Sequence, residues 1–421
     1  MKELRRTLCV IVLILPSILA LLSCIRVVTS FQLLPSFGTK QRVFSLYMGG
    51  YTSDIMTGGA FWNRETSKQG DYSGPIVKEA RIIALSDPKD DFNNEAFLHH
   101  LPAEAKLLGI GLTYDDIMTS LSSNKEEELP NVIFVSSSHP KVKESLQQLV
   151  EEFSSSLEWI HSRSAGIDAY VSSELASTLS SSTETNIQMT NAKGMYSSTL
   201  AEYTMMAIAY FAKDLPRLIQ QQSDSLWKKY PVEEIRGQTI GIIGYGDIGR
   251  AIAKLAKAYG MTVVATRRNP KLSQYDPYCD TILGNESLHT LMEQSDFIVV
   301  AAPLTETTRG MVNKEVLSHV KPQKAVIINV GRGPIIDEDA LIHALQTGLV
   351  KGAALDVVSQ EPLPTTSPLW NMTQNVLLSP HNMDQTITFM KESTDFFVQE
   401  NIPRFLRNLP LLNPVNPSNG Y

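Results

Sequence analysis

The segment TIGIIGYGDIGRAIAKLAKAYGMTVVATRR, residues 239–268, constrains the fold of this 421-residue chain more than any other. It opens with a β-branched run that is typical of a buried parallel strand. A G-x-G-x-x-G turn follows at Gly244, Gly246 and Gly249, and then come a helical pattern and a second apolar strand. Strand, glycine turn, helix and strand in this order predict a doubly wound α/β domain.

A glycine turn between a strand and a helix favours a dinucleotide-binding site. Its glycines permit a tight turn, a close approach of the backbone to a pyrophosphate and close packing of helix on strand. The free N–H groups and the positive dipole end of the helix face the phosphates. We expect cofactor contacts at Gly244, Gly246 and Gly249. A structural βαβ unit without a ligand is the alternative.

The end of the second strand indicates which dinucleotide binds. An NAD site has an acidic residue there, about 20 residues after the glycines, which holds the ribose 2′-hydroxyl. This chain has Thr266, Arg267 and Arg268 instead. Guanidinium groups pair with a 2′-phosphate, and a threonine hydroxyl can donate to it. We therefore expect a preference for NADP(H), with NAD(H) as the alternative if the arginines are only solvated loop charges.

The start of the chain differs from the rest. In residues 1–30, basic residues precede an apolar run over residues 8–25, and small residues follow before Phe31, as in a secretory signal peptide. Residues 31–75 are poor in acidic residues and show no helix or strand pattern, so we expect a disordered targeting segment. The combination is similar to the bipartite presequences of plastid proteins in algae with extra plastid membranes. Secretion, or membrane anchoring by residues 8–25, is the alternative.

Composition excludes several classes of function. The formal net charge is −7, and the basic residues are scattered without interleaved aromatic residues, which argues against nucleic-acid binding. Two of the three cysteines lie in the leader, which leaves Cys279 alone and rules out a disulfide framework or a cysteine metal cluster. We expect no metal site, no nucleic-acid partner and, after cleavage of the leader, no membrane association.

Strand and helix patterns alternate on both sides of the glycine turn, and the length of the chain suggests two domains. Strand-like runs cover residues 76–85, 132–135, 157–160, 296–302, 325–330 and 352–358. A long apolar helix is predicted over residues 199–212. In sheets of this kind, ligands bind at the carboxyl ends of the strands.

Three residues that follow apolar runs have the chemistry for hydride transfer at a carbonyl. Arg332 lies in NVGRGPIID, Glu361 in ALDVVSQEPLP and His381 in SPHN. A guanidinium can pair with the carboxylate of a 2-keto acid and polarise its carbonyl. A carboxylate beside an imidazole raises the imidazole pKa, so that the imidazolium can protonate the carbonyl oxygen. Their spacing alone does not distinguish these roles from those of a loop charge, a solvated acid and a structural histidine.

The order and the amino-acid sequences of these segments resemble those of the D-isomer-specific 2-hydroxyacid dehydrogenase family over residues 130–415. The matching segments are GIIGYGDIGR, AAPLTETTRG, INVGRGPIIDEDAL, GAALDVVSQEPLP and SPHN. The resemblance implies that Arg332 orients the substrate, that His381 is the acid/base and that Glu361 is its carboxylate partner. It further implies cofactor contacts at Asp247, Ile248, Pro303, Thr308, Val330 and Asp356, and substrate contacts at Ala165 and Gly166.

The family topology implies two doubly wound parallel-sheet domains, with a Rossmann cofactor domain inserted in a flavodoxin-like substrate domain. The substrate domain would comprise residues 76–196 and 380–415, and the NAD(P)-binding domain residues 197–379. The resemblance also implies a homodimer formed through the cofactor domain.

We expect an oxidoreductase that transfers hydride between NADP(H) and a small 2-keto or 2-hydroxy acid. Ser359, where many members have an acid, makes the chain similar to the glyoxylate/hydroxypyruvate reductases. The sequence Asn382-Met383-Asp384 replaces the common small Gly-Ser pair and changes the edge of the substrate pocket. A dinucleotide-binding scaffold with little catalysis, similar to the corepressors of the family, is the alternative.

Overall fold

The computed structural model of the chain describes residues 72, 74–123, 128–181 and 187–419. The expected signal peptide and nearly all of the expected targeting segment lie outside these residues. The structured part begins before residue 76, where we expected it to start. The Tyr72 hydroxyl donates to Glu400 Oε2 at 2.5 Å, and Arg407 donates to the carbonyl of Gly74 at 3.0 Å, so both residues are attached to the C-terminal helices. Among the described residues, no helix is long and apolar enough to span a bilayer.

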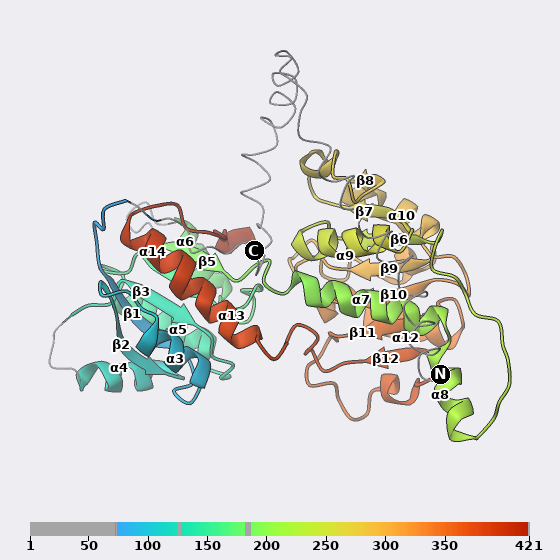
Figure 1. Ribbon diagram of the computed structural model, residues 1–421, viewed down its shortest axis with the longest axis horizontal. Helices are drawn as coiled ribbons and strands as arrows, with labels where there is room; N and C mark the ends of the chain where they lie inside the picture. Colours follow the sequence, from blue (N-terminus) through green and yellow to red (C-terminus); the bar gives the residue numbers. More distant parts are fainter. Residues whose placement is uncertain (1–71, 73, 124–127, 182–186, 420–421) are drawn as a thin grey trace, which may run out of the picture. The chain divides into compact units, whose positions relative to one another are not determined.

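Five parallel strands form the first sheet, in the order β2-β1-β3-β4-β5 (Figure 1). They are β1 (Ala80–Leu85), β2 (Ala105–Gly111), β3 (Val132–Val135), β4 (Trp159–Ser162) and β5 (Gln188–Asn191). The helices between them are α3 (Asp91–His99), α4 (Tyr114–Ser122), α5 (Val142–Glu152) and α6 (Ser173–Ser181). β3 and β4 are buried along their whole length, as expected for strands of a parallel sheet that is covered on both faces.

Seven parallel strands form the second sheet, in the order β12-β11-β10-β9-β6-β7-β8. They are β6 (Thr239–Ile243), β7 (Thr262–Thr266), β8 (Thr281–Leu283), β9 (Phe297–Val300), β10 (Val326–Asn329), β11 (Gly352–Leu355) and β12 (Val376–Leu378). β6 pairs with β7 on one side and with β9 on the other. The strand order therefore reverses at β6, and in doubly wound sheets ligands bind at such a point.

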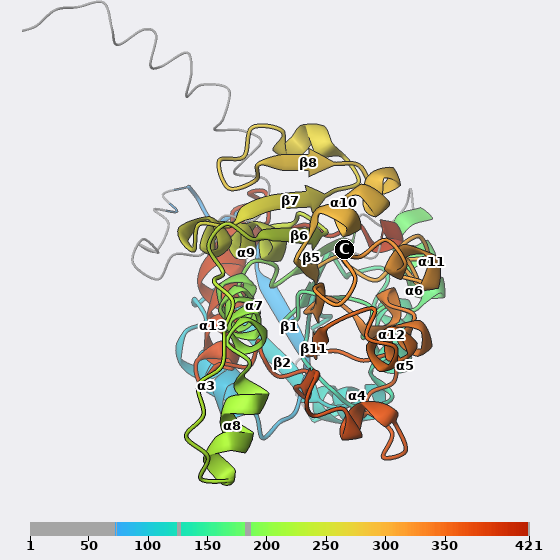
Figure 2. The same ribbon diagram turned by 90° about the vertical axis from the view of Figure 1, so that its right-hand side faces the viewer.

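Helices cover both faces of the second sheet. The helices in this part of the chain are α7 (Ser197–Ala212), α8 (Leu215–Ser223), α9 (Asp247–Ala258), α10 (Leu288–Gln294), α11 (Lys314–Leu317) and α12 (Glu338–Gln346), with short helical turns η1 (Pro270–Ser273), η2 (Asn285–Ser287), η3 (Gly333–Ile335) and η4 (Pro368–Asn371). All of these α-helices except α8 pack on the sheet. Figure 2 shows α7 and α9 on one face and α10, α11 and α12 on the other. The described chain thus consists of two parallel-sheet α/β units, and the expected fold class is confirmed.

The C-terminal segment packs on the first sheet rather than on the second. It comprises α13 (Phe389–Asp395), a π-helical stretch η5 (Phe396–Asn401), α14 (Ile402–Leu406) and a final turn η6 (Pro417–Asn419). The ring of Phe397 lies 4.8 Å from that of Phe134 and 5.0 Å from that of Trp159. The segment therefore helps to complete the apolar core of the first sheet, although nearly 200 residues separate it from β5.

Element boundaries differ from the sequence expectations in several places. β4 begins at Trp159 instead of Leu157, and α7 begins at Ser197 instead of Thr199. The apolar patterns also do not predict α3, β2, α4 or α8. For α4 a signal was present, because Thr113 and Asp116 form a capping box at its start.

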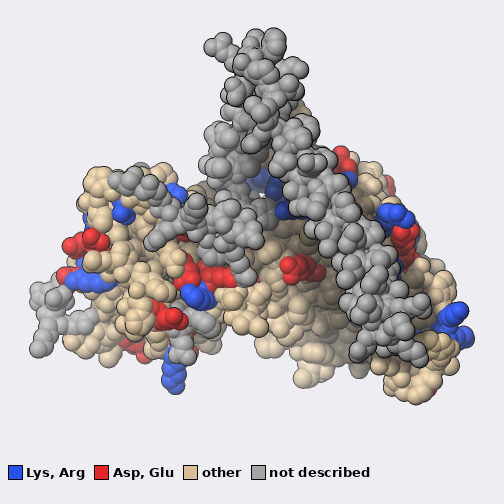
Figure 3. All heavy atoms as spheres, in the orientation of Figure 1, with Lys and Arg blue, Asp and Glu red and all other residues tan. Residues whose placement is uncertain are grey.

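Charged side chains of both signs are interspersed on the face shown in Figure 3. Partly exposed ion pairs of the described chain include Lys351 with Glu233 at 2.6 Å and Lys257 with Asp280 at 2.8 Å. Exposed pairs of this kind contribute about 0–1 kcal/mol each. The apolar clusters on the faces of the two sheets therefore provide most of the stabilisation.

Candidate active site

The turn between β6 and α9 has the geometry of a pyrophosphate cradle. Gly244 has a φ of 98°, and its position admits no side chain, because a Cβ there would lie 2.6 Å from the backbone nitrogen of Ala302. Gly246 is the N-cap of α9; no side chain caps the helix, and a Cβ at Gly246 would meet nothing within 4 Å. The first N–H groups of α9 therefore border open space, which fits an anionic group.

The three residues at the end of β7, Thr266, Arg267 and Arg268, differ in how far they are exposed to solvent. Thr266 is 1% exposed, its carbonyl accepts from the N–H groups of Gly244 and Tyr245, and its buried hydroxyl has no partner among the described residues. Thr266 thus supports the glycine turn. Arg267 is partly exposed and donates to the Ser273 hydroxyl in η1, whereas Arg268 is exposed.

Most of the other expected cofactor contacts also follow strand ends. The Thr308 hydroxyl donates to the Pro303 carbonyl at 2.7 Å, which holds the loop after β9 in a compact turn. Val330 directly follows β10 and is 4% exposed. Asp356 directly follows β11; its Oδ1 accepts from the Ser379 hydroxyl at 2.7 Å and from the Asn382 N–H at 3.2 Å.

Arg332 is held by the turn that follows β10. Its Nη1 donates to the Gly331 carbonyl at 2.9 Å, and the Asn329 amide donates to the Arg332 carbonyl at 3.1 Å. The next residue, Gly333, lies directly against the backbone of Val358, where a Cβ would overlap. This close approach brings the Arg332 turn beside the loop that carries Glu361.

Glu361 and His381 form a hydrogen-bonded pair. Glu361 Oε2 lies 2.7 Å from His381 Nδ1, and Oε1 accepts from the Val358 N–H at 3.1 Å. His381 has a φ of 51°, a left-handed conformation that costs about 1–2 kcal/mol for a residue other than glycine. Its N–H donates to the Asp356 carbonyl at 2.8 Å, which helps to hold this conformation.

The electrostatics of the pair favour a protonated imidazole. The hydrogen bond that His381 makes to the Glu361 carboxylate raises the pKa of His381, against the opposing effect of burial. Burial acts to raise the pKa of Glu361, but the hydrogen bond and charge of His381 outweigh it and leave that pKa below its usual value. Arg332 lowers the pKa of both groups through its charge, so the three side chains lie within electrostatic reach of one another.

Arg332 also makes an ion pair with Asp168, a residue that the sequence patterns did not single out. Its Nε and Nη2 lie 3.2 Å from the two carboxylate oxygens. Burial acts to raise the pKa of Asp168, but Arg332 outweighs it and lowers that pKa. Gly166 permits the contact, because a Cβ there would overlap the guanidinium. The neighbouring Ala165 carbonyl accepts from the Asn191 amide at 2.5 Å.

Asp384 is a second acidic residue near the pair. Burial raises its pKa, and the charges of His381 and Arg332 act in the opposite direction. Its Oδ1 is buried without a hydrogen-bond partner among the described residues. It lines a small cavity of about 40 Å³ together with Thr199 and Phe389. The only sequence signal for it was the unusual Asn-Met-Asp after the histidine.

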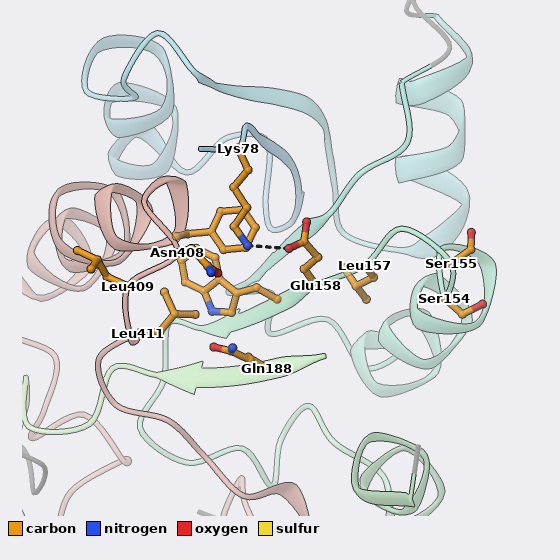
Figure 4. A pocket seen from close by; sticks show the side chains of 11 residues that line it. Lys78, Ser154, Ser155, Leu157, Glu158, Gln188, Asn408, Leu409 and Leu411 are labelled. Carbon is orange, nitrogen blue, oxygen red and sulfur yellow. Dashed lines mark hydrogen bonds and ion pairs between the residues drawn. The ribbon is translucent and has the colours of Figure 1, made fainter. Parts of the chain in front are cut away.

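A larger pocket of about 320 Å³ lies elsewhere (Figure 4). It is formed at the amino ends of β4 and β5, where Trp159 and Gln188 begin these strands, and by the segment after α14. Lys78 and Glu158 form an ion pair at 2.6 Å across it. The predicted catalytic side chains instead follow the carboxyl ends of strands in the second sheet, so this pocket is separate from them.

The chain is similar to known proteins in sequence and in fold. Residues 205–382 match the family described as D-isomer specific 2-hydroxyacid dehydrogenase, NAD binding domain. A glyoxylate reductase of Korarchaeum cryptofilum is 32% identical over 250 residues, 56% of this chain and 70% of the relative. A hydroxypyruvate reductase of Blautia hydrogenotrophica is 40% identical over 192 residues, 44% of this chain and 56% of the relative.

A solved structure shows the same architecture. The D-isomer specific 2-hydroxyacid dehydrogenase of Xanthobacter autotrophicus, in complex with NADPH and MES, is 28% identical with a TM-score of 0.66. The match covers 82% of this chain and 100% of that one. Several curated relatives are matched over less than two thirds of their length, in one case over 44%. The fold, the ordered motifs and these relatives show that the chain belongs to the D-isomer specific 2-hydroxyacid dehydrogenase family.

Proposed function

We propose that this protein is an NADPH-dependent reductase of a small 2-keto acid, with glyoxylate and hydroxypyruvate as the first candidates. The observation that carries the proposal is the Glu361–His381 pair, with its raised His381 pKa, within electrostatic reach of Arg332. An imidazolium beside a guanidinium can protonate a carbonyl whose carboxylate the guanidinium holds. The two relatives named above, a glyoxylate and a hydroxypyruvate reductase, support the choice of substrates.

In this mechanism each residue has one task. A bound nicotinamide cofactor supplies hydride chemistry at the substrate carbonyl. Arg332 exchanges Asp168 for the substrate carboxylate and thereby orients the keto group. His381 donates its proton to the carbonyl oxygen during reduction and removes it during oxidation. Glu361 keeps the imidazole oriented through Nδ1 and stabilises its charged form.

The preference for NADPH rests on Arg267 and Arg268. Both lie at the end of β7, where an NAD site would have a carboxylate. The solved relative in complex with NADPH supports this choice. Thr266 is not included, because its side chain is buried.

The purified protein is expected to oxidise NADPH in the presence of glyoxylate or hydroxypyruvate, faster than NADH and faster than with pyruvate. Loss of absorbance of the reduced cofactor measures each rate. A preference for NADH would contradict the role of the arginines but leave the proton transfer unaffected. Cofactor binding without turnover of any substrate would instead favour the dinucleotide-binding scaffold.

Variants of the arginines test the cofactor choice directly. Arg267→Ala and Arg268→Ala are each expected to raise KM for NADPH by about 10- to 100-fold, since a hydrogen bond to a charged group is worth about 1.5–3 kcal/mol. KM for NADH should change little. Lys229→Ala, which removes an exposed charge outside the turn, is the matched control.

We also propose that the protein forms a homodimer through its second domain. Four large apolar residues on α8 and the segment after it are exposed: Leu218, Ile219, Leu226 and Trp227, the last of them 98% exposed. Contiguous exposed apolar side chains are characteristic of protein interfaces. Figure 1 shows α8 and this segment extending away from the second sheet.

Sedimentation measurements are expected to show a dimer that Trp227→Asp converts to a monomer. Ile387→Asp changes an equally exposed apolar side chain, 96% exposed, outside this segment and should leave the dimer intact. A monomeric unmodified protein would contradict the proposal.

A further inference from the structure

We propose that His289, Glu315 and His319 form a zinc-binding site on the surface of the second domain. Each offers a ligand atom, and these atoms all lie within 4.8 Å of one another. His289 Nε2 is 3.4 Å from Glu315 Oε1, and the two imidazole rings are stacked with centroids 4.2 Å apart and an interplanar angle of 7°. None of these residues belongs to the proposed reaction, so the site stands independently of it.

Glu293 supports the site as an outer partner, a residue that hydrogen-bonds a ligand without binding the metal itself. It lies one helical turn after His289 on α10, and its Oε1 is 3.0 Å from His319 Nδ1. When Nδ1 donates to this carboxylate, the lone pair of Nε2 is left to bind a metal. Histidines that ligate metals usually donate their other ring N–H to a carboxylate or carbonyl in this way.

The backbone under the site is well supported. α10 is anchored in the core by Leu291 and Met292, and α11 by Val316 and Leu317. Asn313 caps α11 by accepting from the Val316 N–H at 2.9 Å. The ligands therefore project from two fixed segments, α10 and the α11 region, and only their side chains need to rotate.

The donor set indicates which ion binds. Two imidazoles and one carboxylate suit Zn²⁺, whereas Mg²⁺ prefers six oxygen ligands. Zinc–nitrogen bonds of about 2.0–2.1 Å place tetrahedral ligand atoms roughly 3.3 Å apart. The ligand atoms, which lie within 4.8 Å of one another, must therefore approach by up to about 1.5 Å. The side chains are between 33% and 68% exposed, which leaves access for the ion and for a water molecule as the fourth ligand.

Bound zinc would tie α10 to the α11 region. α11 follows the loop that contains Pro303 and Thr308, and Val312 just before α11 forms a β-bridge with Ile336 in the segment after Arg332. The unfolded chain has no preformed zinc site, so zinc would bind the folded chain preferentially. Bound zinc should therefore raise the unfolding temperature.

Isothermal titration of the untagged full chain with ZnCl₂, together with thermal unfolding, tests the site. We expect one Zn²⁺ per chain at this site, a higher unfolding temperature with zinc and no such effect of MgCl₂. Glu293→Gln should weaken binding by about 10- to 100-fold, the usual effect of losing an outer partner. His289→Gln and His319→Gln should each weaken it further and abolish the thermal shift.

Two controls separate this site from others. His343→Gln, which changes an exposed histidine on α12, should leave zinc binding unchanged. His381→Gln removes the imidazole of the catalytic pair, so zinc bound there would be lost while the proposed site persists. Zinc binding that survives both His289→Gln and His319→Gln, or that disappears only with His381→Gln, would overturn the proposal. If either variant fails to fold, Glu315→Gln gives the same test with an exposed carboxylate.

Discussion

The His381→Asn variant is expected to lose about 10²- to 10⁴-fold in kcat for reduction of glyoxylate or hydroxypyruvate, the usual contribution of a general acid. Asparagine cannot supply a proton at the position of the imidazole. KM for NADPH should stay nearly constant, because the side chain contacts Glu361 and not the glycine turn. Initial rates over a range of both substrates separate the two parameters. His139→Asn, a change at a partly exposed histidine outside the site, is the matched control.

The pH profile extends this prediction. Reduction needs protonated His381, so its rate falls as the pH rises through the His381 pKa. Glu361 raises that pKa, and Glu361→Gln removes the charge that does so. The alkaline limb of the kcat/KM profile for reduction should therefore move to lower pH in Glu361→Gln. A limb that stays in place would show that another group limits the rate.

The second domain was the more predictable half of the chain because its signals are local. Residues 239–268 carry strand, turn and helix in one continuous segment, and the structure places β6, α9 and β7 there. In the first domain, the apolar patterns miss β2, whose sequence AKLLGIG has buried and partly buried residues without strict alternation. Such a strand is specified by its neighbours more than by its own sequence.

In the candidate site too, residues with local sequence signals were predicted, whereas contacts that depend on tertiary packing were not. Arg332, Glu361 and His381 were identified because each follows an apolar run and lies in a family motif. The partner Asp168 lies 164 residues from Arg332, so no spacing in the sequence connects the two. Thr266 was expected to face a phosphate, but whether a hydroxyl at a strand end is buried depends on tertiary packing. The proximity of His289 and His319 likewise depends on how α10 and α11 pack.

Arg332→Gln and Asp168→Asn are expected to change kcat/KM for the keto acid in opposite directions. Arg332→Gln removes a bidentate charged contact, and two hydrogen bonds to a charged group are together worth about 3–6 kcal/mol. A loss of about 10²- to 10⁴-fold in kcat/KM follows. Asp168→Asn removes the carboxylate that occupies the guanidinium at 3.2 Å, so the substrate carboxylate no longer has to displace a like charge.

For Asp168→Asn, the gain should appear mainly as a lower KM for the keto acid, since Asp168 competes with the substrate for Arg332 before the chemical step. KM for NADPH should not change, and the double variant should behave like Arg332→Gln alone because both changes act through one guanidinium. Initial-rate measurements on the three variants provide the comparison. If Asp168→Asn raises KM for the keto acid instead, the ion pair positions Arg332 for the substrate, and Asp168 is a positioning residue and not a competitor.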